Sequence, residues 1–179
     1  MASLSNWFCY ASSKVGYSIS LYQKTHGRVD AKSFDTIMKT ILVGKLTFLH
    51  QNKSEDVSPT IGTEAGTFLV RRIPHADPTL AAVEGHEMAS TDEKDEPFIL
   101  EDNECWVLAD NEDLKPKDSY DSRSFGPVTL SDIIGRAIYC LKNDVDHGPV
   151  NNSDLSANED SPVLAVELDV DELKKNNRR

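Results

Sequence analysis

The stretch from Ser119 to Tyr139, SYDSRSFGPVTLSDIIGRAIY, contains the residue types and spacing best suited to a built site. Arg123 follows Asp121 by two residues, so its guanidinium can pair with that carboxylate across a tight turn and fix a loop. Gly126 and Pro127 then redirect the chain into a following strand. An Asp-Ser-Arg sequence is common by itself, so the neighbouring segments decide what this stretch does.

Other reactive residue types lack the spacing that their chemistry requires. The histidines form no paired zinc-binding motif, and a surface role is predicted for each of His26, His50, His75, His86 and His147. The acidic run STDEKDEP lacks the residue order of a calcium loop. The chain has neither a glycine-rich phosphate-binding motif nor a G-x-S-x-G sequence. We therefore expect no metal and no cofactor.

Length and charge limit the classes of protein that this chain can represent. Its 179 residues suit one domain with tails. Residues 1–50 carry six Lys or Arg and two Asp or Glu, whereas the rest carries thirteen basic and 28 acidic residues. An acidic body argues against nucleic-acid binding, because that affinity comes largely from cations that neutralise phosphates. The widely spaced Cys9, Cys105 and Cys140 are predicted to be buried or free thiols.

The N-terminal part is predicted to be helical. Residues 1–33 are rich in serine and poor in acids, which is typical of an organelle-targeting segment. Their aromatic and aliphatic residues also suit an amphipathic helix, lying on an anionic membrane or packed on the domain, and these alternatives stay open. Residues 34–50 favour a second amphipathic helix, on a core or at a membrane interface, because they are too short and too charged to predict a membrane span.

The remaining elements predict a mainly β fold. Residues 51–141 contain a loop that feeds a strand at Thr67 to Val70, two short apolar runs, PFIL and CWVLA, expected to pair across EDNE, and a β-branched run after Pro127. Residues 142–179 are predicted to form a disordered, acidic and flexible tail. Within this tail, VLAVELDVDEL is expected to form a short helix or strand that docks on a partner.

Four segments, read in order, resemble successive boxes of the signal peptidase I family, especially its organellar branch, the mitochondrial inner membrane peptidases. These segments are SEDVSPTIG, LAAVEG, CWVLADN and SYDSRSFGPVTLSDIIGRA. The last box is matched most fully, at Ser119, Asp121, Ser122, Arg123, Gly126, Pro127, Val128, Gly135, Arg136 and Ala137. The resemblance runs from about residue 54 to residue 140.

This resemblance implies a mostly β catalytic domain that is tethered or applied to a membrane. The last box would form the wall of a peptidase cleft and the strand behind it. Mitochondrial inner membrane association is implied, with the plastid as the alternative, because the N-terminal composition suits both organelles. The implied partners are other peptidase subunits, an extended peptide or a membrane surface.

The family's catalytic Ser-Lys dyad is not matched. Asp56 stands where the nucleophilic serine belongs, and Ser58 is the alternative nucleophile. Thr79 and Pro78 precede the LAAVEG segment, where the family's general-base lysine would be expected. Neighbouring arginines cannot replace that lysine, because a guanidinium stays protonated.

The resemblance leaves three hypotheses for function. The first is a non-catalytic homologue or subunit of a membrane-associated complex that processes signal peptides or presequences. The second is an active serine endopeptidase that removes targeting peptides with Ser58 or with a serine from a partner subunit. The third is a splice-shortened, poorly folding and incomplete family member, because the interval from Pro59 to Leu80 leaves too little chain for the family's intervening Gly-Asp strand.

Overall fold

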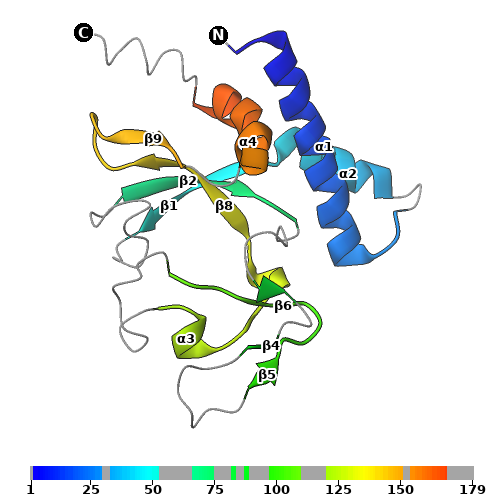
Figure 1. Ribbon diagram of the computed structural model, residues 1–179. Helices are drawn as coiled ribbons and strands as arrows, with labels where there is room; N and C mark the ends of the chain where they lie inside the picture. Colours follow the sequence, from blue (N-terminus) through cyan, green and yellow to red (C-terminus); the bar gives the residue numbers. More distant parts are fainter. Residues whose placement is uncertain are drawn as a thin grey trace. The chain divides into compact units, whose positions relative to one another are not determined.

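The computed structural model describes most of the chain as two compact units. The described residues are 2–29, 33–52, 66–74, 82–83, 87–88, 97–109, 120–150 and 154–168. The first unit comprises Met1–Lys53, Ala65–Pro74 and Gly135–Arg179, and the second comprises Ser54–Glu64 and His75–Ile134. Figure 1 shows their elements along the chain.

The first unit contains a four-stranded antiparallel sheet in the order β1-β2-β8-β9. Its strands are β1 (Thr47–Asn52), β2 (Gly66–Arg72), β8 (Gly135–Leu141) and β9 (His147–Pro149). The predicted strand at residues 67–70 is confirmed within β2, and the β-branched run predicted after Pro127 includes β8. These two strands pair along their lengths, because both are rich in the branched and aromatic residues that favour pleated, half-buried surfaces.

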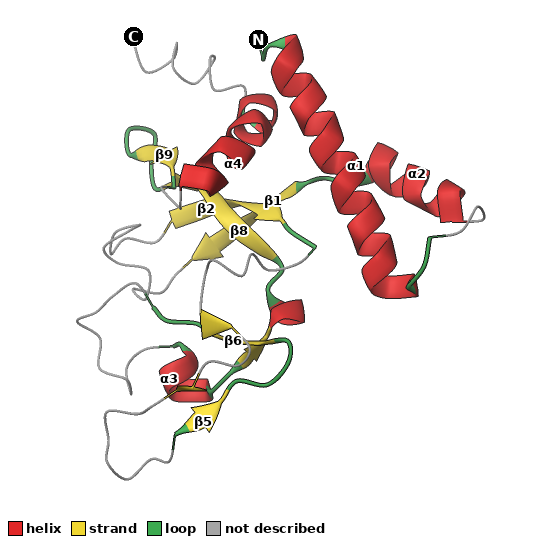
Figure 2. Cartoon of the chain, turned by 45° about the vertical axis from the view of Figure 1, so that its right-hand side comes forward, coloured by secondary structure: helices red, strands yellow, loops and turns green. Residues whose placement is uncertain are grey.

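Three helices accompany this sheet (Figure 2). They are α1 (Leu4–His26), α2 (Phe34–Val43) and α4 (Asp154–Glu167). The Ser3 hydroxyl caps the start of α1, and Gly27 ends it at a φ of 81°, a conformation that glycine adopts readily. Within the described ranges, no helix combines the length and the apolar composition needed to cross a bilayer.

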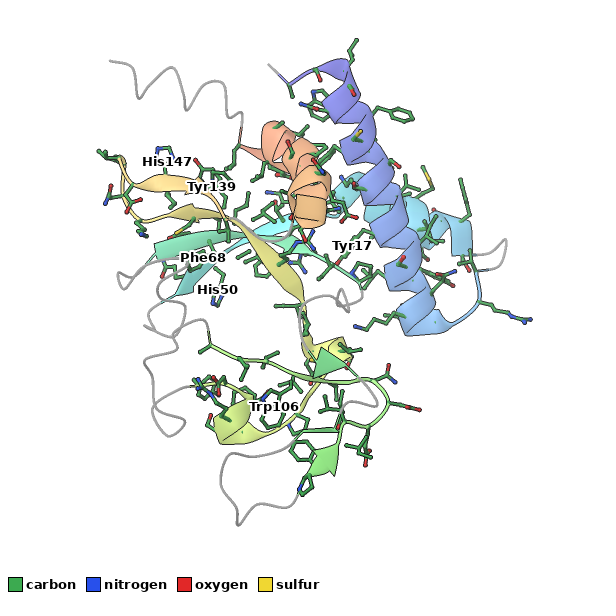
Figure 3. The ribbon with its side chains drawn as sticks, viewed as in Figure 1. Tyr17, His50, Phe68, Trp106, Tyr139 and His147 are labelled. Carbon is green, nitrogen blue, oxygen red and sulfur yellow. The ribbon has the colours of Figure 1, made fainter. Side chains whose placement is uncertain are left out.

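The core of this unit lies between the sheet and the helices. Its buried members are Leu46, Leu69, Ile138, Tyr139 and Val163, and the partly buried Tyr10, Tyr17, Leu164 and Leu168 pack against them. Figure 3 shows Tyr17 of α1 among the side chains between the helix and the sheet. The interpretation of residues 1–33 as a helix packed on the domain therefore agrees with the structure over Leu4–His26, whereas removal as a targeting segment is untested.

The prediction of a disordered tail is wrong for residues 142–150 and 154–168, which form β9 and α4 with their flanking turns. Two buried side chains help to hold α4 to its own unit. Val163 is fully buried in the core, and Asp160 is buried in ion pairs with two strand residues. The described part of the apolar run that was expected to dock on a partner, residues 163–168, therefore packs against the core of its own unit.

The helix predicted over residues 34–50 is confirmed only in its first part. The helix α2 ends at Val43, and strand β1 begins at Thr47. Gly44, with an extended backbone, follows the helix, and the residues after Lys45 have the β-branched and aromatic composition of a strand.

The second unit contains short strands and one short helix. A three-stranded sheet has the order β3-β6-β7, and β4 pairs with β5. The elements are β3 (Ala82–Val83), β4 (Glu87–Met88), β5 (Phe98–Ile99), β6 (Glu104–Trp106), α3 (Ser122–Phe125), β7 (Val128–Thr129) and the 3-10 helix η3 (Leu130–Asp132).

The two predicted apolar strands of this unit exist, but their predicted pairing is wrong. β5 pairs with β4, while β6 pairs with β3 and β7. The turn between them positions β6 for β7, because Asn103 has a φ of 66° and its carbonyl accepts a hydrogen bond from the Leu130 amide at 2.7 Å. The mainly β fold class is confirmed by the antiparallel strands of both units.

Candidate active site

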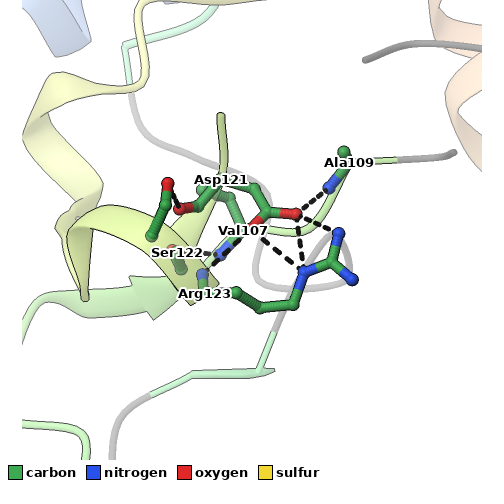
Figure 4. A network of polar contacts seen from close by, with 6 residues as sticks. Val107, Ala109, Asp121, Ser122 and Arg123 are labelled. Atoms are coloured by element: carbon green, nitrogen blue, oxygen red, sulfur yellow. Dashed lines mark hydrogen bonds and ion pairs between the residues drawn. The ribbon is translucent and has the colours of Figure 1, made fainter. Parts of the chain in front are cut away.

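Asp121 is the centre of a compact polar network in the second unit (Figure 4). Asp121 is 2% exposed. Its carboxylate caps α3 by accepting a hydrogen bond from the Arg123 amide at 2.9 Å. The Arg123 guanidinium binds the same carboxylate, with Nη2 2.6 Å from Oδ2. The Ala109 amide donates to Oδ2 at 2.9 Å. The predicted Asp-Arg pairing across a tight turn is confirmed.

Ser122 joins this turn to the segment that follows β6. Its Oγ accepts a hydrogen bond from the Val107 amide at 2.9 Å, and its own amide donates to the Val107 carbonyl at 2.9 Å. The residue is 1% exposed. Because its hydroxyl is buried and already hydrogen-bonded, Ser122 is placed to hold two segments together and cannot reach a substrate carbonyl.

The charged groups of this network are not suited to proton transfer. The hydrogen bond to Asp121 raises the pKa of the Arg123 guanidinium, which is already far above neutrality. The carboxylate is covered by its partner and by two backbone amides. The network is therefore a rigid ionic turn that positions its neighbours.

Gly126 and Pro127 redirect the chain as predicted. Gly126 has a φ of 89°, which an L residue rarely adopts, and its amide donates to the Ser122 carbonyl at 2.9 Å. The chain then enters β7, where Val128 lies opposite Cys105 of β6.

The other half of the same sequence box lies in the first unit, at the start of β8. A Cβ atom on Gly135 would lie 2.5 Å from the Arg71 carbonyl oxygen, so only glycine permits this approach of β8 to β2. The Arg136 guanidinium makes two hydrogen bonds to Asp160, at 3.0 Å from Nε and 2.9 Å from Nη2. Gly135 and Arg136 are thus structural residues of the sheet, separate from the Asp121 network.

Three of the predicted site residues lie outside the described part of the chain: Asp56, Ser58 and Ser119. The absence of the catalytic dyad therefore stays a prediction from sequence. Arg71 and Arg72 precede the segment where the general-base lysine was expected, and both have structural roles. Arg71 Nη1 lies 2.5 Å from Asp160 Oδ1. The Arg72 guanidinium lies 4.8 Å from the centre of the Phe48 ring.

Asp160 is the structurally important residue that sequence reasoning missed. It looked like one of many acids in an acidic tail. The available signal was Val163, which follows by one helical turn and therefore lies on the same face of a helix. A buried apolar residue at that spacing indicates a docked face.

The remaining candidate ligands show no clustering. Among the side chains that the structure describes, no group of three or more His, Cys, Asp or Glu residues could hold a metal ion. Cys9 is exposed, while Cys105 and Cys140 are buried, and all three are free thiols as predicted. Burial raises the pKa of both buried thiols, which disfavours their reactive thiolate forms.

Comparison with known proteins gives two positive findings. The family model described as signal peptidase, peptidase S26, matches residues 43–141. The chain is 48% identical over 204 aligned positions to the mitochondrial ATP-independent inner membrane protease subunit 2 of Arabidopsis thaliana, an alignment that covers 99% of this chain and 100% of that protein. No solved structure matches.

The alignment with this relative is longer than the chain itself. It spans 204 positions against 179 residues, so at least 25 aligned positions of the relative have no residue in this chain. Because the alignment covers nearly the whole of both proteins, these missing positions are internal.

Proposed function

The chain belongs to the signal peptidase family, in its mitochondrial inner membrane branch, and from this premise we propose that it is a non-catalytic subunit of a membrane-associated processing complex. The predicted association with the mitochondrial inner membrane is confirmed by the near full-length relationship to the Arabidopsis thaliana protein. The name of that relative states that it is a protease subunit, which supports other peptidase subunits as partners of this chain.

The observation that carries the proposal is the residue at the nucleophile position. Amide cleavage by this family requires a serine hydroxyl and a lysine that is kept neutral by burial. Asp56 offers a carboxylate, whose acyl product would be an anhydride, and neither Pro78 nor Thr79 can accept a proton as the lysine does. The chain therefore lacks both halves of the reaction.

The scaffold residues of the family are kept, in contrast to the dyad. The ionic turn at Asp121 and the close approach at Gly135 are both built as the fold requires. A domain that keeps its structural residues while its reactive residues change is suited to binding. Among the described strands, β1 and β9 lie at the sheet edges, where an extended peptide can add as a further strand.

Active-site labelling tests the proposal directly. The purified chain is treated with a serine-reactive peptidase inhibitor and then assayed with a presequence peptide. We expect neither label nor cleavage. We also expect neither in Asp56→Ser, because the new hydroxyl has no general base beside it.

The alternative of an active endopeptidase makes the opposite prediction. If Ser58 is the nucleophile, the unaltered chain is labelled and Ser58→Ala is not. Ser12→Ala, which alters an exposed serine of α1, is the matched control and should behave as the unaltered chain. Labelling that survives Ser12→Ala and is lost in Ser58→Ala would overturn the non-catalytic proposal.

A second proposal, supported by the alignment, is a shortened family member that folds poorly. At least 25 positions are missing internally, and the sequence locates the deficit between Pro59 and Leu80. Loss of a central strand would remove ladder hydrogen bonds and core contacts together. Such a loss can exceed the stability of about 5–15 kcal/mol that is typical of a domain.

A further inference from the structure

The helix α1 carries an exposed apolar stripe along one face. The stripe consists of Leu4, Phe8, Val15 and Ile19, whose exposed fractions are 91%, 77%, 39% and 36%. Their spacing of four, seven and four residues repeats the helical period, so they share one face of the helix. Trp7, 52% exposed, lies beside Phe8. Large apolar side chains gathered in this way mark an interaction surface.

Other side chains of α1 contact the remainder of the first unit, and these contacts determine which way the stripe faces. Tyr10 and Tyr17 pack against the core. The Tyr10 hydroxyl donates to Glu167 Oε1 of α4 at 2.6 Å, and the Ser33 hydroxyl donates to the Tyr22 oxygen at 2.7 Å. The stripe therefore lies on the face of α1 opposite to Tyr10 and Tyr17, on a helix that these residues anchor.

The charge of residues 1–29 indicates which class of partner the stripe can bind. Residues 1–29 contain Lys14, Lys24 and Arg28 and no acid, whereas the rest of the chain has sixteen basic and 30 acidic residues. An acid-free helix with an apolar stripe complements an anionic lipid surface, because the negative headgroups attract nearby cations. A second copy of the chain would bring two positively charged helices together, which electrostatic repulsion opposes.

We propose that the stripe on α1 is the surface through which the first unit lies on an anionic bilayer. In this arrangement α1 lies parallel to the bilayer plane, with Leu4, Phe8, Val15 and Ile19 inserted below the lipid headgroups. The inference rests on the inner membrane association described above and adds the contacting surface. It does not depend on whether the chain is catalytic.

Vesicle flotation with the full chain tests this inference. Vesicles of phosphatidylcholine with phosphatidylglycerol are compared with vesicles of phosphatidylcholine alone. We expect binding to the anionic vesicles, a weakening at high salt, and a blue shift of fluorescence emission that Trp7→Phe reduces. Leu4→Ser combined with Phe8→Ser should lower binding about tenfold or more, because two large side chains lose their burial in lipid.

Control measurements distinguish the loss of lipid contact from the loss of folding. Val145→Ser alters a side chain that is 88% exposed in the turn before β9, and it should bind as the unaltered chain does. Urea unfolding of each variant shows whether it is folded. Equal binding by the double variant and the unaltered chain would overturn the inference. The inference would also be overturned if the chain does not bind anionic vesicles but forms dimers that Leu4→Ser combined with Phe8→Ser dissociates. Labelling at Ser58 would contradict the proposed function alone.

Discussion

Asp160 neutralises two arginines that come from adjacent strands. Arg71 and Arg136 lie opposite each other in the register of β2 and β8, and Asp160 of α4 binds both. Replacing Asp160 with alanine leaves two like charges side by side with little access to water. We expect Asp160→Ala to lower the free energy of unfolding, measured in urea, by about 3–5 kcal/mol.

The neighbouring residue provides a matched control for this prediction. The Glu159 side chain is 67% exposed, and its Oε2 lies 3.6 Å from Arg136 Nη2. Glu159→Ala should change the free energy of unfolding by no more than about 0.5 kcal/mol, because exposed ion pairs contribute little. Similar values for the two variants would contradict the role assigned to Asp160.

Glycine is required at position 135 because the backbone of β2 lies too close to admit a side chain there. An alanine methyl group would lie 2.5 Å from the Arg71 carbonyl oxygen and 2.7 Å from Val70 Cγ1. We expect Gly135→Ala to lower the free energy of unfolding by about 1–3 kcal/mol, since the two strands must separate to admit it. Gly148→Ala, where no atom lies within 4 Å of the added Cβ, should cause no loss, as measured by thermal or urea unfolding.

Local pairs of residues were predictable from sequence, and distant pairs were not. Asp121 and Arg123 lie two residues apart, so a turn alone brings them together. Asp160 lies 24 residues from Arg136 and 89 from Arg71, and nothing in the spacing of these residues identifies them as partners. Their pairing depends on where β2, β8 and α4 meet in the folded unit.

The contact between α1 and α4 predicts a dependence on alkaline pH. Burial and the hydrogen bond to Glu167 raise the pKa of Tyr10 above its usual value. The unfolded chain therefore loses this proton at lower pH than the folded chain does. The stabilisation is fully present below about pH 10, the ordinary tyrosine pKa, and is lost as pH rises through the higher folded value.

Comparison of variants isolates the contribution of Tyr10 to this pH dependence. Free energies of unfolding in urea are measured between about pH 9 and pH 11, across the ordinary tyrosine pKa. Tyr10→Phe should show a smaller decline than the unaltered chain. Tyr120→Phe, which alters an exposed ring, serves as the control. An unchanged decline in Tyr10→Phe would show that this hydroxyl is not held between the helices.

Elements with strong local patterns were predicted correctly, and those stabilised by tertiary contacts were not. The strands β2 and β8 each contain a run of apolar, branched or aromatic residues, and α1 has long helical periodicity. The helix α4 begins in a polar, acidic sequence and contains Pro162, so its own sequence does not favour a helix. Burial of Val163 and the ion pairs of Asp160 stabilise it instead.

This chain lacks at least 25 internal positions that its aligned relative has, and their effect on stability is a property of the whole molecule. Insertion of the relative's unmatched residues between Thr79 and Leu80 would restore the length expected for the family. If a core strand is missing, the insertion should raise both the free energy of unfolding and the slope of its dependence on urea, because more surface becomes buried. Amide exchange should slow in the second unit.

A glycine and serine insertion of equal length at the same site is the control for this chimera. It adds only loop entropy, which changes slowly with length, and should leave the unfolding slope unchanged. Equal behaviour of the two insertions would contradict a missing strand. It would indicate that the shorter chain closes its fold without that segment.

The position of Asp160 in the chain has a consequence for biosynthesis. The ribosome makes Arg71 and Arg136 before it makes the carboxylate that both of them bind. Translation therefore completes β2 and β8 before it adds the carboxylate of α4 that binds both arginines. A premature stop codon after β8 would spare the whole segment matched by the family model, yet would release a polypeptide that lacks the carboxylate bound by both Arg71 and Arg136.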